Sequence, residues 1–151
     1  MGLIESIGHG LVAVDSVAFI YFVEQHPAYV DLLRPLFSLA NSGQLDLVTS
    51  AVTLLEVLVI PCRAGDSALA SRYEALLTRS RGLMMIDIDS AQLRLAAQLR
   101  ARDGVRTPDS LQLAAALTRR CTAIVTNDRR LPSLPGLRVV QLDLMRYYSG
   151  H

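Results

Sequence analysis

Short apolar runs alternate with longer helical segments along almost the whole chain, and this alternation limits the fold more than any other feature. The short runs cover residues 11–14, 45–49, 83–88, 123–126 and 137–142. The longer segments cover residues 16–23, 28–39, 50–59, 66–79, 89–102 and 107–119, and a short tail helix follows from residue 143. Apolar strands separated by helices are typical of a parallel sheet that is buried on both faces. We therefore expect an α/β fold: a three-layer α/β/α sandwich with a central parallel sheet of four to five strands.

Capping residues and prolines mark where the helices begin and end. Ser50 can cap the helix after the second strand, and Pro61 is expected to close it because proline lacks an amide hydrogen. Thr107, Pro108 and Asp109 form a helix start in which Thr107 is the N-cap and Pro108 takes the first helical position. These signals place Asp109 in the first turn of a helix.

Composition indicates one globular domain. The 151 residues are 51% apolar and 19% charged, so residues 1–151 can form a single packed domain. The apolar runs are too short to span a membrane, and the start of the chain lacks the basic region of a secretory signal, so we expect a cytoplasmic protein without a membrane segment. Cys62 and Cys121 are isolated in apolar sequence and are predicted to be buried free thiols.

Four acidic residues stand where a purely structural role explains them poorly as a set. Asp15 and Asp128 directly follow predicted strands, at the edge where open α/β sheets bind ligands. Glu56 lies among apolar neighbours, where burial of a lone carboxylate is costly, and Asp109 opens a helix. Taken singly, Asp15 has an alternative role as a helix cap, Asp109 as a first-turn acid and Asp128 as a turn residue. Glu56 has the weakest alternative, since no basic residue lies three or four positions away.

Convergence of these acids predicts a divalent-cation site. Carboxylates gathered in a partly desolvated pocket must take up protons or bind a cation. Oxygen-only ligands favour Mg²⁺ or Mn²⁺, and the three histidines are scattered without the spacing of a metal site. Such cations activate a bound water and orient a phosphate for in-line displacement.

The basic residues are all arginine, fifteen in number, and they balance the acids to a net charge of +1. Arginine suits bidentate phosphate contacts, although a codon bias of the source genome explains arginine-only usage at least as well. Seven arginines near the acidic motifs are candidate phosphate contacts, and most of them are expected to lie on solvated helix faces. They are Arg100, Arg102, Arg106, Arg119, Arg120, Arg129 and Arg130.

Four motifs in order along the chain resemble those of the PIN-domain nucleases, and most closely the VapC toxins. They are Val12-Ala13-Val14-Asp15-Ser16, Thr49-Ser50 with Glu56, Arg106-Thr107-Pro108-Asp109-Ser110, and Ile124-Val125-Thr126-Asn127-Asp128. The resemblance implies that Asp15, Glu56, Asp109 and Asp128 are the catalytic, metal-binding acids and that Thr126 supports them. It further implies cleavage of RNA with Mg²⁺ or Mn²⁺, a small antitoxin partner and a homodimer. Ser110 and Gln112 stand where the family often has Ala and His, which leaves substrate preference open.

The main alternative is a catalytically silent PIN-like module that binds RNA or protein, and the intact acidic set argues against it. A receiver domain is disfavoured because the chain has no lysine. A haloacid-dehalogenase-type phosphatase needs DxD after the first strand, where this chain has Asp15-Ser16-Val17. A dinucleotide-binding enzyme needs GxGxxG after a strand, and Gly8-His9-Gly10 precedes one instead.

Overall fold

The computed structural model describes residues 2–149 and confirms the predicted α/β class and parallel sheet. The strands are β1 (Val12–Val14), β2 (Leu47–Ser50), β3 (Leu83–Ile86), β4 (Ala123–Thr126) and β5 (Arg138–Gln141). Every pair of neighbouring strands runs parallel, and the order across the sheet is β3-β2-β1-β4-β5. The helices are α1 (Leu3–Ile7), α2 (Ser16–Val23), α3 (Val30–Asn41), α4 (Val52–Ala64), α5 (Ser67–Arg79), α6 (Ser90–Asp103), α7 (Thr107–Thr118) and α8 (Leu142–Ser149).

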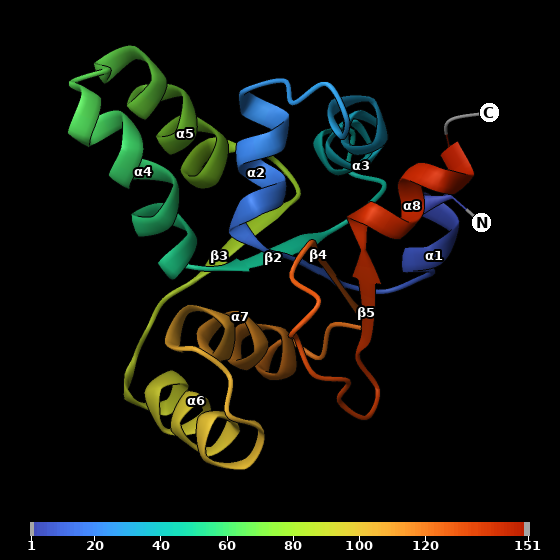
Figure 1. The fold of residues 1–151 in the computed structure, drawn as a ribbon, viewed down its shortest axis with the longest axis vertical. Coiled ribbons are helices and arrows are strands. Elements are labelled where there is room, and N and C mark those ends of the chain that lie inside the picture. Colours follow the sequence, from blue (N-terminus) through green and yellow to red (C-terminus); the bar gives the residue numbers. More distant parts are fainter. Residues whose placement is uncertain (1, 150–151) are drawn as a thin grey trace.

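Two hydrophobic cores, one on each face of the sheet, lie between the sheet and the helix layers that cover it. Helices α2, α3, α4 and α5 lie on one side of the sheet, and α6 and α7 lie on the other (Figure 1). Successive strand residues point to opposite faces, so Val12 and Val14 enter the first core whereas Ala13 enters the second. The central strands are therefore apolar along most of their length, which is why their sequence shows continuous runs rather than alternation.

The strand order reverses beside β1, and this reversal locates the site. From β1 the chain proceeds outward to β2 and β3, and it then returns to the other side of β1 as β4, followed by β5. The connections after β1 and after β4 consequently leave the sheet edge in different directions. A crevice opens between them at the carboxyl ends of these two strands, where open α/β sheets bind ligands.

Several predicted boundaries need correction. Helix α4 does not end before Pro61 but continues to Ala64, because Pro61 packs against the protein interior and Gly65 then ends the helix in the left-handed conformation, with φ 66°. Helix α7 has Arg106 as its N-cap and begins at Thr107, one residue earlier than the capping pattern indicated. Helix α1 was not predicted at all; its five residues carry too little periodicity, and buried Leu3 and Ile7 hold it.

Other differences follow from where hydrogen bonding begins and ends. Helix α3 starts at residue 30 rather than 28, since His26 accepts the amides of Tyr29 and Val30 in a preceding turn. Strand β2 starts at residue 47 rather than 45 and β3 ends at residue 86 rather than 88, where their mutual pairing starts and stops. Strands β1 and β5 are also slightly shorter than predicted, and α8 begins at residue 142.

The two cysteines differ in burial. Cys121 is buried as predicted, but Cys62 is exposed, because it lies on the outer side of the last turn of α4. Helices in the described part of the chain lack the combination of length and apolarity that a membrane span needs.

Candidate active site

Asp15 lies in the crevice between β1 and β4 and is held by three hydrogen bonds. It is the residue between β1 and α2, where its Oδ1 accepts the Ser16 amide at 2.7 Å and the Ser16 hydroxyl at 3.4 Å. Its Oδ2 accepts the hydroxyl of Thr126, the last residue of β4, at 2.9 Å. Asp15 is 8% exposed, so both carboxylate oxygens are fixed in a nearly solvent-free position. Its role as helix cap, one of the alternatives from the sequence, is therefore present as well.

Thr126 connects Asp15 to Asp128. The same Thr126 hydroxyl that donates to Asp15 accepts the backbone amide of Asp128 at 3.1 Å. Between them, the Asn127 amide nitrogen donates to the hydroxyls of Tyr21 and Tyr29, each at 3.2 Å. The turn after β4 is thus tied to the end of β1 and to α2, and Asp128 is set at the rim of the crevice.

Glu56 and Asp109 are brought to the crevice by two helices that a buried network joins. Gln112 of α7 donates to Thr53 of α4 at 2.6 Å and accepts the Ser50 amide at 3.1 Å. Thr53 precedes Glu56 by three residues and Gln112 follows Asp109 by three, so each network residue and its acid share a helix face. The network therefore fixes the spacing between the two helices that carry these acids.

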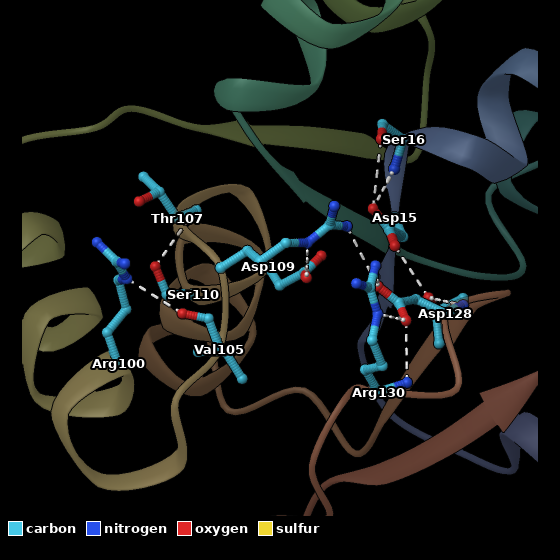
Figure 2. A network of polar contacts seen from close by, with 11 residues as sticks. Asp15, Ser16, Arg100, Val105, Thr107, Asp109, Ser110, Asp128 and Arg130 are labelled. Atoms are coloured by element: carbon cyan, nitrogen blue, oxygen red, sulfur yellow. Dashed lines mark hydrogen bonds and ion pairs between the residues drawn. The ribbon is translucent and has the colours of Figure 1, made fainter.

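All four predicted acids line one cavity of about 330 Å³. Figure 2 shows Asp15, Asp109 and Asp128 directed toward a common region, with Arg130 against Asp128. Besides the four acids and Arg130, the lining contains Ser16, Val17, Tyr21, Arg106 and Asn127. Thr126 is not part of the lining, but its hydroxyl contacts the lining residue Asp15. The structure thus brings together every site residue that the sequence predicted.

Burial and mutual repulsion perturb three of the acids in the same direction. Burial raises the pKa of Asp15, and the negative charge of Asp128 adds to the rise, against the hydrogen bonds from Thr126 and Ser16. Burial also raises the pKa of Glu56, with further contributions from Asp15 and Asp109. For Asp109 the pKa is raised by burial first, then by the charges of Asp15 and Asp128.

Asp128 differs because arginine compensates its charge. Arg130 donates to Asp128 Oδ1 from Nε at 3.1 Å and to Oδ2 from Nη2 at 3.2 Å, which holds the pKa of Asp128 below its ordinary value. Arg106 bridges two acids: its Nε lies 3.4 Å from Asp109 Oδ2, and its Nη2 lies 3.4 Å from Asp128 Oδ2. Two guanidinium groups therefore face the rim of an otherwise acidic cavity.

The donor chemistry fits a hard divalent cation, although the side chains do not stand in ligand positions. Glu56 Oε1 is buried but meets no hydrogen-bond donor among the described residues, so it has an unused acceptor in an all-oxygen site. Within residues 2–149, however, no three His, Cys, Asp or Glu side chains stand close enough together to hold a metal ion. Arg106 and Arg130 occupy oxygens of Asp109 and Asp128 instead.

Sequence reasoning missed several residues of this site. Tyr21 and Asn127 line the cavity, and Gln112 with Thr53 positions two of the acids, although none was singled out as a site residue. Gln112 carried a usable signal: it is a polar residue within the apolar face of a helix, where a buried hydrogen-bond partner is required. Tyr21 carried none, since an aromatic residue in an apolar helix is usually part of a core.

The PIN-domain family model matches residues 12–137 of this chain. That span begins at β1 and includes all four acids and Thr126. PIN domains are generally nucleases and are typically dependent on divalent metal. A comparison with curated proteins gave no match.

Solved structures with a similar fold come from several bacteria. VapBC2 from Rickettsia felis bound to a DNA fragment from their promoter is 17% identical, with a TM-score of 0.68 over 87% of this chain and 98% of that chain. A toxin–antitoxin complex from Klebsiella pneumoniae is 20% identical, with a TM-score of 0.64 over 87% and 97%. DNA-bound VapBC from Salmonella typhimurium is 24% identical, with a TM-score of 0.59 over 89% and 99%. At these identities the likeness concerns the fold.

Proposed function

Because this chain belongs to the PIN-domain family, we propose that it is a Mg²⁺- or Mn²⁺-dependent endoribonuclease and the toxin of a toxin–antitoxin pair. Residues 1–151 would form a single PIN domain. One observation carries it: four acids from four separate elements line a single cavity at the strand-order reversal. Independent structural roles for the four acids do not explain that convergence.

Asp15, Glu56, Asp109 and Asp128 would hold the cations. When bound, divalent cations activate a water for attack on phosphorus and offset the charge that develops on the leaving oxygen. Asp15 supplies a rigid carboxylate, since the bonds from Thr126 and Ser16 fix its orientation before any ligand arrives. Glu56 supplies the unpartnered oxygen, and the Gln112 network keeps it at a constant distance from α7. The mutual repulsion of these acids is relieved by a cation, which favours metal over proton uptake at neutral pH.

Cleavage of RNA with and without divalent cation tests the proposal. Purified protein is incubated with a mixed-sequence RNA in Mg²⁺, Mn²⁺ or excess EDTA, and the products are resolved on a denaturing gel. We expect cleavage only with cation and expect Asp15→Asn to abolish it. Undiminished cleavage in EDTA would exclude metal dependence, and RNA binding without cleavage in every condition would favour the silent module.

The proposed partners are a small antitoxin protein and a second copy of this chain. The antitoxin is supported by a structural neighbour that is itself a toxin–antitoxin complex. The homodimer is supported by an apolar stripe on α4, where Leu55 and Ile60 are 65% and 66% exposed and Val59 is 41% exposed. The antitoxin is tested by expressing this chain alone and with the product of an adjacent small gene, which should relieve growth arrest. The homodimer is tested by measuring the molecular mass in solution of wild type and of Ile60→Glu, which should lower the mass to that of a monomer.

A further inference from the structure

Arg106 spans the mouth of the acidic cavity. It is the N-cap of α7, and its guanidinium contacts Asp109 in the first turn of α7 and Asp128 in the turn after β4. Both contacts are 3.4 Å long, and 61% of the Arg106 side chain is exposed. A long, solvated ion pair of this kind contributes little to stability and is easily exchanged. The contact is thus a weak internal neutralisation of the site rather than a structural anchor.

Arg106 and a divalent cation would compete for the same two carboxylate oxygens. Asp109 Oδ2 and Asp128 Oδ2 are the atoms that Arg106 approaches, and both acids belong to the set that would hold metal. A cation placed between them would repel the guanidinium at short range. The described arrangement, in which no three acids are in ligand positions, is therefore the one expected while Arg106 is paired with the site.

The guanidinium released in this way would lie where an RNA phosphate must enter. An acidic cavity repels a polyanion, so substrate binding needs positive charge beside the acids. A guanidinium offers a planar pair of donors that matches phosphate geometry. Resting on the proposed function, we propose that Arg106 is a phosphate-binding residue that the cation-free site keeps paired with Asp109 and Asp128, and that cation binding frees it to contact the RNA backbone.

Arg130 does not have the same role. It lies two residues from Asp128 and also donates its backbone amide to Asp128 Oδ1 at 2.9 Å, which makes its contact a local turn. Of the arginines in residues 2–149, Arg106 is the one whose side chain contacts acids of two different elements at the cavity mouth. The inference therefore concerns Arg106.

Metal affinity without RNA is the first arm of the test. Mn²⁺ binding is measured by titration calorimetry for wild type, Arg106→Gln and the control Arg102→Gln. Arg102 has the same side-chain exposure, 61%, and pairs with Asp103 outside the cavity, so its removal changes net charge equally. Loss of a competing partly exposed ion pair should tighten Mn²⁺ binding about two- to fivefold in Arg106→Gln. The control should not change, and equal affinities in all three proteins would overturn the exchange.

RNA affinity is the second arm, measured by fluorescence anisotropy with a labelled single-stranded RNA in EDTA and in Ca²⁺, with the RNA checked for integrity afterwards. Arg106→Gln should weaken binding in Ca²⁺ but hardly in EDTA, where the arginine is already paired. It should also lower the salt slope of log affinity by about 0.7 in Ca²⁺, as for one lost contact to a single strand. Arg106→Lys should retain part of the affinity because it keeps the charge without the planar fork.

The outcomes separate this inference from the proposed function. Equal weakening in EDTA and Ca²⁺ would make Arg106 an ordinary basic surface residue, and unchanged RNA affinity would leave it a structural ion pair; either result overturns the inference while nuclease activity stands. Absence of RNA cleavage by the wild type in Mn²⁺ would overturn the proposed function. The Mn²⁺ titration would still report whether Arg106 competes with the cation.

Discussion

Asp15 and Asp128 follow neighbouring strands, β1 and β4, and share the hydroxyl of Thr126, yet their surroundings are opposite. Asp15 is buried and receives only neutral donors, and its pKa is raised. Asp128 lies at the rim with its side chain 16% exposed, is paired with two arginines, and its pKa is lowered. The Thr126 hydroxyl thus joins two parts of the site. The inner half, formed by Asp15, is costly to charge, whereas the charge of the outer half, Asp128, is already neutralised by Arg106 and Arg130.

The difference indicates how the site divides its tasks. The inner half is rigid, and the carboxylate of Asp15 accepts hydrogen bonds from Ser16 and Thr126 but meets no arginine among the described residues. The outer half can exchange Arg106, because that side chain is 61% exposed and its contacts with Asp109 and Asp128 are both 3.4 Å long. We expect the inner acid to dominate activity and metal response and the outer acid to govern the arginine contacts.

Neutralising the inner acid should have the largest effect. We expect Asp15→Asn to lower RNA cleavage at least about a hundredfold, since a cation at this carboxylate supplies several kcal/mol of charge stabilisation. In EDTA the variant should melt at a higher temperature than wild type, because one repelling charge is gone, and Mg²⁺ should raise its melting temperature less. Asp128→Asn should not gain melting temperature in EDTA, because it removes the acceptor of two arginines.

Thermal melts of both variants with EDTA and with Mg²⁺ measure this contrast. Asparagine caps a helix nearly as well as aspartate, so a purely structural Asp15 would leave cleavage and the metal-dependent shift unchanged. That result would remove Asp15 from the metal site.

Removing the shared hydroxyl should have the next largest effect. Thr126→Val deprives the buried Asp15 carboxylate of a donor and the Asp128 amide of an acceptor, so we expect a loss of about 1–3 kcal/mol in the free energy of unfolding. Thr122→Val is a matched control. Thr122 directly precedes β4, and its hydroxyl donates to the backbone oxygen of His9 near the surface. Urea unfolding in EDTA should show the smaller loss for Thr122→Val, and equal losses would contradict a special role for Thr126.

The pH dependence of stability should differ in sign between the two acids. The raised pKa of Asp15 means that the metal-free folded state binds its proton more tightly than the unfolded state does. Its contribution is therefore present below the ordinary value of 3.8 and is lost as pH rises through the folded pKa. The lowered pKa of Asp128 gives a contribution that is present above 3.8 and is lost as pH falls through the folded pKa.

Unfolding free energies in EDTA, measured from pH 3 upward, test these signs through each Asn variant. The advantage of Asp15→Asn over wild type should grow as pH rises, whereas wild type should gain relative to Asp128→Asn. Parallel curves for the two variants would contradict the division into inner and outer halves.

Arg130→Gln should have the smallest effect. Arg130 is largely exposed, so removal of its side-chain contacts should lower the melting temperature only slightly. The pKa of Asp128 should nevertheless move up toward its ordinary value, because the largest cause of its lowering is the hydrogen bond from Arg130. Titration of the Asp128 carboxyl carbon by NMR, with Arg129→Gln as control, measures this; an unchanged pKa would show that Arg106 alone compensates the charge.

Much of the fold was predictable because its signals are local. Apolar runs bounded by turn residues gave the strands of the sheet, and Asp89 and Asp66 cap their helices as such residues do. Errors fell where a long-range contact outweighed a local rule. Burial of Pro61 allows α4 to continue past this residue to Ala64. Burial of Leu3 and Ile7 stabilises α1, which is too short to be recognised from the sequence.

The sequence by itself indicated the four acids that line the cavity. Asp15 and Asp128 follow strands and Asp109 starts a helix, which are locally encoded positions, and parallel strands bring their ends to one edge of the sheet. Glu56 stood out as a lone carboxylate among apolar neighbours. Only the tertiary structure decided how each acid is charged and paired. Burial of Asp15 beside Thr126, and the reach of Arg106 across to Asp128, join residues 111 and 22 positions apart. Desolvation and side-chain ion pairs depend on distances in space, and no local pattern in the chain fixes those distances.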